Sequence, residues 1–190
     1  AGKAVGGGGD YNGDGIKDIL ISAPNYYFTS HGLVYVIYGH DSDFVDINLA
    51  GFTTGPAGFI IIGQDSDDYV GSVLSNAGDV NGDDFDDIVV CAPTKGLPGK
   101  ESAGACYVVF GQSTSTRTTD LYLSAIAATA TGGFRITGSV EYENFGASVS
   151  GGFDFNQDGH SDFIIGAPMY APAGRAAGPV QRPATDRHHP

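Results

Sequence analysis

A nine-residue acidic segment occurs three times in this chain at a fixed register. The copies are Asp10–Asp18, Asp79–Asp87 and Asp154–Asp162, and their starts lie 69 and 75 residues apart. Each copy has Asp at its positions 1, 5 and 9 and Asn at its position 3. A spacing kept over this length predicts a tandem structural unit, because unrelated acidic turns would not share one frame.

The shared register extends beyond the acids. A glycine lies eight residues before the first Asp of each copy, and an Ala-Pro pair ends fourteen residues after it. Two apolar runs also recur, since 34–39 corresponds to 106–111 and 58–63 corresponds to 133–138. The repeated unit therefore contains several structural elements in a constant order. The glycines are Gly2, Gly71 and Gly146, and the prolines are Pro24, Pro93 and Pro168.

Each unit contains short runs rich in Val, Ile, Tyr and Phe, bounded by Gly, Pro or Asp, which is typical of β-strands. In the second unit these runs are 71–75, 87–91, 106–110 and 134–137. Four antiparallel strands per repeat describe a β-propeller blade, whereas the units of a β-solenoid are much shorter. We expect an all-β fold, with a short helix or turn at the alanine-rich stretch 121–129.

The units divide the chain into two and a half expected blades. They are 1–57, 58–132 and a partial third at 133–178, followed by an atypical tail at 179–190. The tail is rich in Pro, Arg and His, and proline lacks the N–H that a central strand needs. A closed propeller needs at least about four blades. A truncation, an alternative exon or a frame change in a longer parent chain would explain the tail, and a ring assembled from several short chains is a weaker alternative.

The acidic segments have the chemistry of calcium loops. Carboxylates at alternating positions of a tight loop point toward a common centre, and Ca²⁺ accepts six to eight such oxygens. Side chains at positions 1, 3, 5 and 9 and the carbonyl at position 7 would supply them, so we expect up to three structural Ca²⁺ ions. The expected ligands are Asp10, Asn12, Asp14, Ile16 and Asp18, then Asp79, Asn81, Asp83, Phe85 and Asp87, then Asp154, Asn156, Asp158, His160 and Asp162.

An EF-hand begins with the same pattern but needs a Glu at position 12 and flanking helices. Position 12 is Ile21, Val90 or Ile165, each inside a strand-like run, so the EF-hand is excluded. The simplest alternative is three solvated acidic turns, which would not require a shared frame. Position 6 is Asp84 in the second loop and Gly in the others, so we expect that site to bind more weakly.

Composition restricts the partners. Asp and Glu outnumber Lys and Arg by 22 to 9, and the scattered bases form no stripe for a nucleic-acid backbone. No apolar stretch approaches the ~20 residues of a membrane span, so we expect no membrane contact within this segment. Cys91 and Cys106 lie in strand-like runs. A cross-strand disulfide is one option, and two buried free thiols are the favoured one.

These motifs resemble the FG-GAP repeat of integrin alpha-subunit β-propellers and of related bacterial and algal proteins. Phe145-Gly146, Gly166-Ala167-Pro168 and the loop that starts at Gly78-Asp79 carry the resemblance. It implies a propeller that has seven blades in the family, with calcium loops joining the first two strands of each blade on one face. It also implies a protein ligand or partner subunit, bound largely by loops of the opposite face, and an extracellular or cell-surface location.

The favoured function is therefore a calcium-stabilised module for cell adhesion or extracellular protein recognition, without catalytic or cofactor-binding residues. One alternative is the accessory propeller of a secreted hydrolase, although no Gly-x-Ser-x-Gly elbow, zinc motif or phosphate-binding loop occurs. Another is a carbohydrate-binding propeller. It ranks lower, because Trp is absent and most Tyr and Phe fall at strand positions.

Overall fold

The computed structural model shows an almost entirely β chain. Among the described residues, the helical segments are a short 3₁₀ turn at Leu49–Gly51 and the helix α1 at Leu123–Thr129, inside the stretch expected to be helix or turn. None of the helices described is long and apolar enough to cross a bilayer. The expected tail at 179–190 lies outside the described part of the chain. The described residues are 1–25, 31–42, 46–66, 68–129 and 132–170.

The first sheet has the strand order β1-β2-β3-β4-β8. Its first four strands pair antiparallel, and β8 joins the outer edge of β4 in parallel. Because β8 follows the second sheet's third strand in sequence, it ties the second unit to the first. The strands are β1 (Val5–Gly7), β2 (Ile19–Ala23), β3 (Leu33–Ile37), β4 (Gly58–Ile62) and β8 (Leu121–Tyr122).

The second sheet is a complete four-stranded antiparallel unit of order β5-β6-β7-β9, as the repeat predicts. The third sheet pairs β10 with β11. The all-β expectation of partial propeller blades is confirmed. The strands are β5 (Val73–Gly78), β6 (Asp87–Ala92), β7 (Ala105–Val109), β9 (Gly133–Thr137), β10 (Ser148–Phe153) and β11 (Asp162–Gly166).

The boundaries between the sheets do not coincide with the expected unit boundaries at 58 and 133. The run that begins at 58 forms β4 and bonds to β3 of the first sheet, and the run that begins at 133 forms β9 and bonds to β7 of the second. The physical reason is antiparallel pairing, which makes each of these runs the fourth strand of the preceding sheet. The sequence register and the hydrogen-bonded sheet are therefore offset by one strand.

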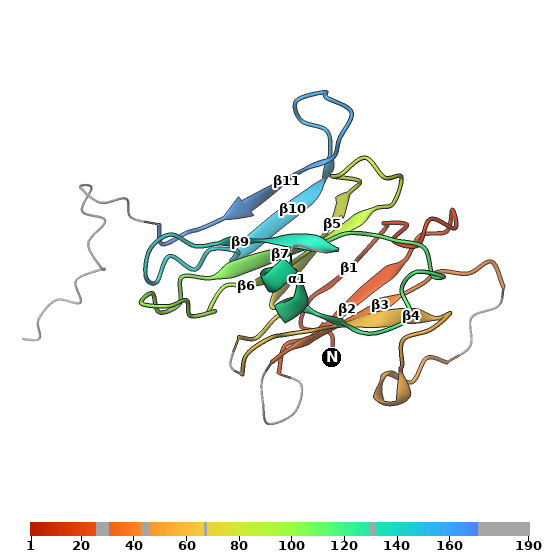
Figure 1. The fold of residues 1–190 in the computed structure, drawn as a ribbon, viewed down its shortest axis with the longest axis horizontal. Helices are drawn as coiled ribbons and strands as arrows, with labels where there is room; N and C mark the ends of the chain where they lie inside the picture. The colour runs from red at the N-terminus through yellow and green to blue at the C-terminus, as the bar shows by residue number, and fades with distance from the viewer. Residues whose placement is uncertain (26–30, 43–45, 67, 130–131, 171–190) are drawn as a thin grey trace, which may run out of the picture.

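The three sheets lie side by side, with β5 in contact with β1 on one side and β10 on the other (Figure 1). Glycines allow this close approach. A Cβ on Gly6 of β1 would lie 2.8 Å from the Leu74 side chain, and one on Gly151 of β10 would lie 2.9 Å from the carbonyl oxygen of Asn76. Strand β10 therefore packs close to the backbone of β5, whereas β1 packs against a side chain of β5.

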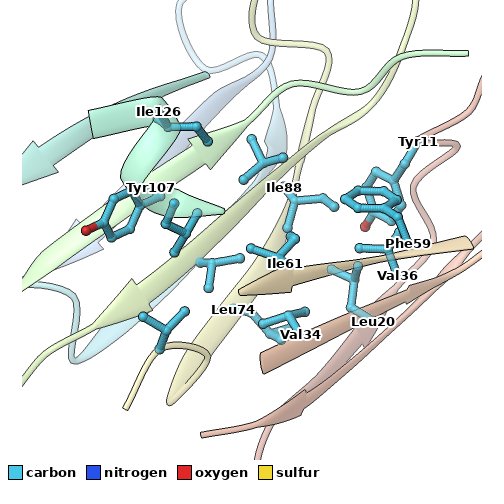
Figure 2. Packing of buried hydrophobic residues seen from close by; sticks show 14 of the residues in the cluster. Tyr11, Leu20, Val34, Val36, Phe59, Ile61, Leu74, Ile88, Tyr107 and Ile126 are labelled. Carbon is cyan, nitrogen blue, oxygen red and sulfur yellow. The ribbon is translucent and has the colours of Figure 1, made fainter. Parts of the chain in front are cut away.

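One hydrophobic core lies between the first and second sheets, and another lies between the second and third. Figure 2 shows the first, where Leu20, Val34 and Phe59 of the first sheet meet Leu74 and Ile88 of the second. In the second core, alternate β6 residues pack with the third sheet. Because side chains of a strand alternate between its two faces, β6 contributes to both cores and is buried along its whole length. The second core contains Val89, Cys91, Cys106 and Val108, with Val149, Phe163 and Ile165 packed against them.

The glycine before each acidic segment has the same role in every unit. Its N–H donates to the carbonyl at position 13 of its own unit, over 2.6 Å from Gly2, 3.2 Å from Gly71 and 2.9 Å from Gly146. Gly71 and Gly146 have φ of 83° and 92°, and a Cβ on Gly146 would lie 2.6 Å from the Sγ of Cys106. A side chain at Gly71 or Gly146 would strain the backbone and clash with the preceding unit, which explains why glycine is required at these two positions.

Cys91 and Cys106 form a disulfide, so the favoured expectation of two free thiols is wrong. The two residues lie directly opposite each other on β6 and β7, with Cα atoms 4.1 Å apart. Both side chains point into the second core. Opposite residues of an antiparallel pair are close enough to be bridged, and the pairing register decides whether two cysteines become opposite.

Loss of this bridge should lower the free energy of unfolding by about 3 kcal/mol, because the disulfide closes a loop of 15 residues in the unfolded chain. The matched variant is Cys91→Ser with Cys106→Val, since Ser22 and Val34 face each other at the corresponding positions of the first sheet. Urea denaturation with and without reductant measures the change. A wild-type protein whose stability is indifferent to reductant would contradict this expectation.

Candidate metal-binding loops

The three acidic segments, named here loop 1 (10–18), loop 2 (79–87) and loop 3 (154–162), each join the first two strands of a sheet. They project from the same end of the sheets, at the upper right of Figure 1. In the second and third sheets the pairing register shifts just before the loop, between Asn76 and Gly78 and between Gly151 and Phe153. Such bulges redirect a strand, and here they lead it into the loop.

The carboxylate at position 1 organises each loop. In loop 1, Asp10 Oδ1 accepts the N–H groups of Gly13 at 2.7 Å and Asp14 at 3.1 Å, and its Oδ2 accepts the N–H of Gly15 at 2.8 Å. In loop 2, Asp79 accepts the three equivalent bonds. In loop 3, Asp154 accepts those from positions 5 and 6. The chain thus turns around the first carboxylate in every copy.

The side chains at positions 3 and 5 are hydrogen-bonded to each other in every loop. The amide nitrogen of the Asn at position 3 donates to the carboxylate at position 5 over 2.9 Å in each of the three loops. The second oxygen of that carboxylate accepts the N–H of position 7, over 2.8 Å from Ile16, 3.1 Å from Phe85 and 2.9 Å from His160. The side chains at positions 3 and 5 are therefore held by hydrogen bonds within the loop, and their role as ligands stays a prediction.

The carboxylate at position 9 lies at the base of the loop and does not bond to the other acids. Asp18 accepts the N–H of Tyr11 at 2.8 Å and that of Gly39, just beyond β3, also at 2.8 Å. Asp87 accepts the equivalent bonds, and Asp162 accepts the N–H groups of positions 2 and 3 of its own loop. Position 9 therefore ties the loop to the body of the sheet.

Two of these carboxylates are buried among other acids. Asp18 is 1% exposed and Asp87 is 0% exposed. Burial raises the pKa of Asp18 to about 6 and that of Asp87 to about 7, against the N–H bonds that favour the charged forms, and repulsion from the acids at positions 1 and 5 adds to the rise. A positive charge beside them would favour the ionised carboxylates.

The donor set fits a hard cation such as Ca²⁺. Carboxylate, amide and carbonyl oxygens are its ligands, and soft metals prefer sulfur or imidazole. Among the residues described, no three His, Cys, Asp or Glu side chains gather into a metal-binding cluster. The three Asp side chains of each loop are therefore not gathered around one point. The Asn at position 3 and the carbonyl at position 7, which is that of His160 in loop 3, are the other ligands that the sequence predicts. The side chains that the sequence indicates thus fit the cation in kind.

Position 6 differs among the loops in a way that the backbone explains. Gly15 and Gly159 have φ of 86° and 93°, and Asp84 has φ of 70°. All three therefore adopt the left-handed conformation that the turn requires, although only glycine adopts it without steric cost. Asp is among the residues that tolerate this region best, so loop 2 keeps the same turn with some strain.

Sequence reasoning missed the contacts between neighbouring loops. Asp86, at position 8 of loop 2, bonds to Asp10 of loop 1, and Ser161, at position 8 of loop 3, donates its N–H to the carbonyl of Asp79 over 2.8 Å. Position 8 is Lys17, Asp86 or Ser161 in the three copies, so no shared residue type marks it. The signal that could have found these contacts is the recurrence of one repeat unit, which places equivalent loops side by side.

Three sheets of one repeat, with one turn at one end of each, define a segment of a β-propeller. The chain belongs to the FG-GAP repeat family, whose repeat it matches at residues 1–37, 70–109 and 145–180. These matches include the three acidic loops and the strands on both sides of each.

Integrin alpha subunits are among its relatives. The chain is 30% identical over 162 residues to integrin alpha-E of Mus musculus and 30% identical over 165 residues to integrin alpha-11 of Homo sapiens, in each case over 83% of this chain and 12% of the relative. It is also 32% identical over 115 residues to the phosphatidylinositol-glycan-specific phospholipase D of Dictyostelium discoideum, over 57% of this chain and 11% of that protein. The chain therefore spans about an eighth of the length of these relatives.

Replacing Asp84 by Gly should raise the free energy of unfolding by about 0.5 kcal/mol, because the relief of left-handed strain outweighs the added freedom of the unfolded chain. Asp84→Ala removes the same charge but keeps a Cβ, so it should be less stable than Asp84→Gly. Chemical denaturation at saturating calcium compares the two variants. Equal stability of the Ala and Gly variants would show that charge, and not backbone conformation, determines the effect.

Proposed function

We propose that this chain is the calcium-stabilised part of an FG-GAP β-propeller that recognises protein partners outside the cell, in cell adhesion or a related process. The observation that carries the proposal is the threefold recurrence of one loop geometry. In each copy the Asn at position 3 donates to the carboxylate at position 5, and the carboxylate at position 9 is anchored by main-chain N–H groups at the base of the loop.

Within each loop, positions 1, 3, 5 and 9 would hold the ion through side chains and position 7 through its carbonyl. The ion supplies a divalent positive charge that offsets repulsion among the acids. The stabilisation of the loop would reach the rest of the sheet through the chain's own residues. Asp18 and Asp87 also accept N–H bonds from Gly39 and Gly111, which follow the third strands. An ordered loop thus fastens the second and third strands of its sheet. This role is structural, and we propose no catalytic role for the chain.

Several observations support an extracellular role. The integrin alpha relatives cover most of this chain, and a disulfide links β6 to β7. Disulfides persist mainly in oxidising compartments such as the cell exterior. Calcium sites of extracellular modules bind in the range of about 10⁻⁴ to 10⁻³ M, which suits exposed loops of this kind.

A second candidate follows from the phospholipase D relative. In that case the chain would serve as the accessory propeller of a hydrolase, with the loops keeping the same structural role. The two candidates differ in what the chain does alone. Binding of the isolated chain to immobilised extracellular-matrix proteins, measured by surface plasmon resonance with calcium and with chelator, would favour recognition. Failure to bind any of them, combined with calcium-dependent stability, would favour the accessory role.

Calcium should stabilise the protein, by about 2.7 kcal/mol per site at a free concentration one hundred times the dissociation constant. Thermal and urea unfolding in calcium and in chelator measure the difference. Removal of the position-5 carboxylates should abolish it, because each of them lies at the centre of its loop. The variant carries Asp14→Ala, Asp83→Ala and Asp158→Ala.

The matched control removes three exposed acids that lie outside the loops and should keep the full response to calcium. It carries Asp41→Ala, Asp46→Ala and Glu141→Ala. Both variants change the net charge equally, so a general charge effect would act on both alike. A wild-type protein that is equally stable in calcium and in chelator would disprove the proposed function.

A further inference from the structure

Asp86 belongs to loop 2 by sequence but contacts loop 1. Its Oδ2 accepts the N–H of Asp10 at 2.7 Å, and its own N–H donates to the carbonyl of Asp10 over 3.0 Å. The same Oδ2 lies 3.3 Å from the Nζ of Lys17. One residue, 76 positions away in sequence, therefore holds both main-chain groups of Asp10.

Asp10 is the residue on which the geometry of loop 1 depends. Its carboxylate accepts the N–H groups of Gly13, Asp14 and Gly15, and it is the first of the proposed cation ligands. A displacement of its backbone would move that carboxylate and the turn wrapped around it. The bonds from Asp86 therefore act on the part of loop 1 that is most sensitive to position.

Other contacts join the same two loops. A Cβ on Gly13 would lie 2.6 Å from the Cε1 of Phe85, so the Phe85 ring lies directly against the turn of loop 1. The N–H of Gln112, which follows β7, donates to the carbonyl of Tyr11 over 3.0 Å. Loop 1 thus contacts both loop 2 and the segment that follows β7.

The junction between loops 2 and 3 repeats only part of this arrangement. The N–H of Ser161 donates to the carbonyl of Asp79, and the ring of His160 lies against Gly82. A side-chain bond from position 8 to the N–H of position 1 is not found at this junction in the described part of the chain. The carboxylate of Asp86 is therefore specific to the first junction.

We propose that Asp86 is a positioning residue for loop 1, so that cation binding at loop 1 depends on a side chain of the neighbouring blade. This inference rests on the proposed calcium function of the loops. The ion pair with Lys17 contributes little, because the Lys17 side chain is 64% exposed and surface pairs are weak. The bond from a main-chain N–H to a carboxylate that is only 23% exposed is the stronger contact.

The test uses the full chain with loops 2 and 3 disabled by Asp83→Ala and Asp158→Ala, so that loop 1 is the remaining proposed site. In this background, Asp86→Ala should weaken Ca²⁺ binding by about tenfold, measured by isothermal titration calorimetry. Asp86→Asn keeps an oxygen that can accept the Asp10 N–H and should retain most of the affinity. Asp84→Asn removes the same charge from the same loop without touching loop 1 and should leave the affinity unchanged.

Equal losses from Asp86→Ala and Asp84→Asn would reduce the effect to general electrostatics and overturn the proposal, as would an unchanged affinity in Asp86→Ala. A background protein that binds no Ca²⁺ would instead contradict the calcium function of loop 1. The coupling is then decided by amide hydrogen exchange in chelator on the otherwise unaltered chain. Asp86→Ala should speed exchange at Asp10, Gly13 and Gly15 and leave loop 3 unchanged, and unaltered exchange in loop 1 would refute the coupling.

Discussion

Burial of β6 on both faces is the constraint on which the rest of the structure depends. Its alternate residues enter two different cores, one shared with the first sheet and one with the third. A strand buried in this way needs apolar side chains on both faces, which explains the continuous run Ile88-Val-Val-Cys91 beside an acidic loop. Because both neighbouring sheets pack on it, the three sheets lie side by side and their acidic loops come together at one end (Figure 1).

The crowding of acids next to buried strands is resolved by main-chain N–H groups. Each carboxylate at position 1 gathers two or three of them. The carboxylate at position 9 takes one from its own loop and one from beyond the third strand in the first two sheets, and two from its own loop in the third. Such bonds favour the charged form of an acid. They do not fully compensate burial, since the pKa values of Asp18 and Asp87 remain raised. The remaining electrostatic cost is what a bound divalent cation would remove.

The repeat register was sufficient to predict the sheets and the acidic loops between their first two strands, and the role of the loop oxygens as ligands stays a prediction. It could not place features that depend on pairing or on contacts between units. The disulfide requires Cys91 and Cys106 to be exact cross-strand partners, which follows from the register of β6 and β7. Strand β8 is two residues long and can be recognised as a strand only from its pairing with β4. The contact of Asp86 with loop 1 could not be predicted from the sequence, because position 8 carries a different residue in each copy.

Outside the acidic loops, main-chain contacts recur among the units where some side-chain contacts differ. The bond from the repeated glycine to position 13 recurs in all three units. Three residues before that glycine, the second unit has Asp68, which pairs with the buried Lys95, whereas the third has Glu143, which accepts a bond from the Ser139 hydroxyl at 3.2 Å. Main-chain contacts depend on the backbone conformation and not on the side chains, so they persist where the side chains differ between units. Each junction is therefore free to acquire its own stabilising pair without altering the shared architecture.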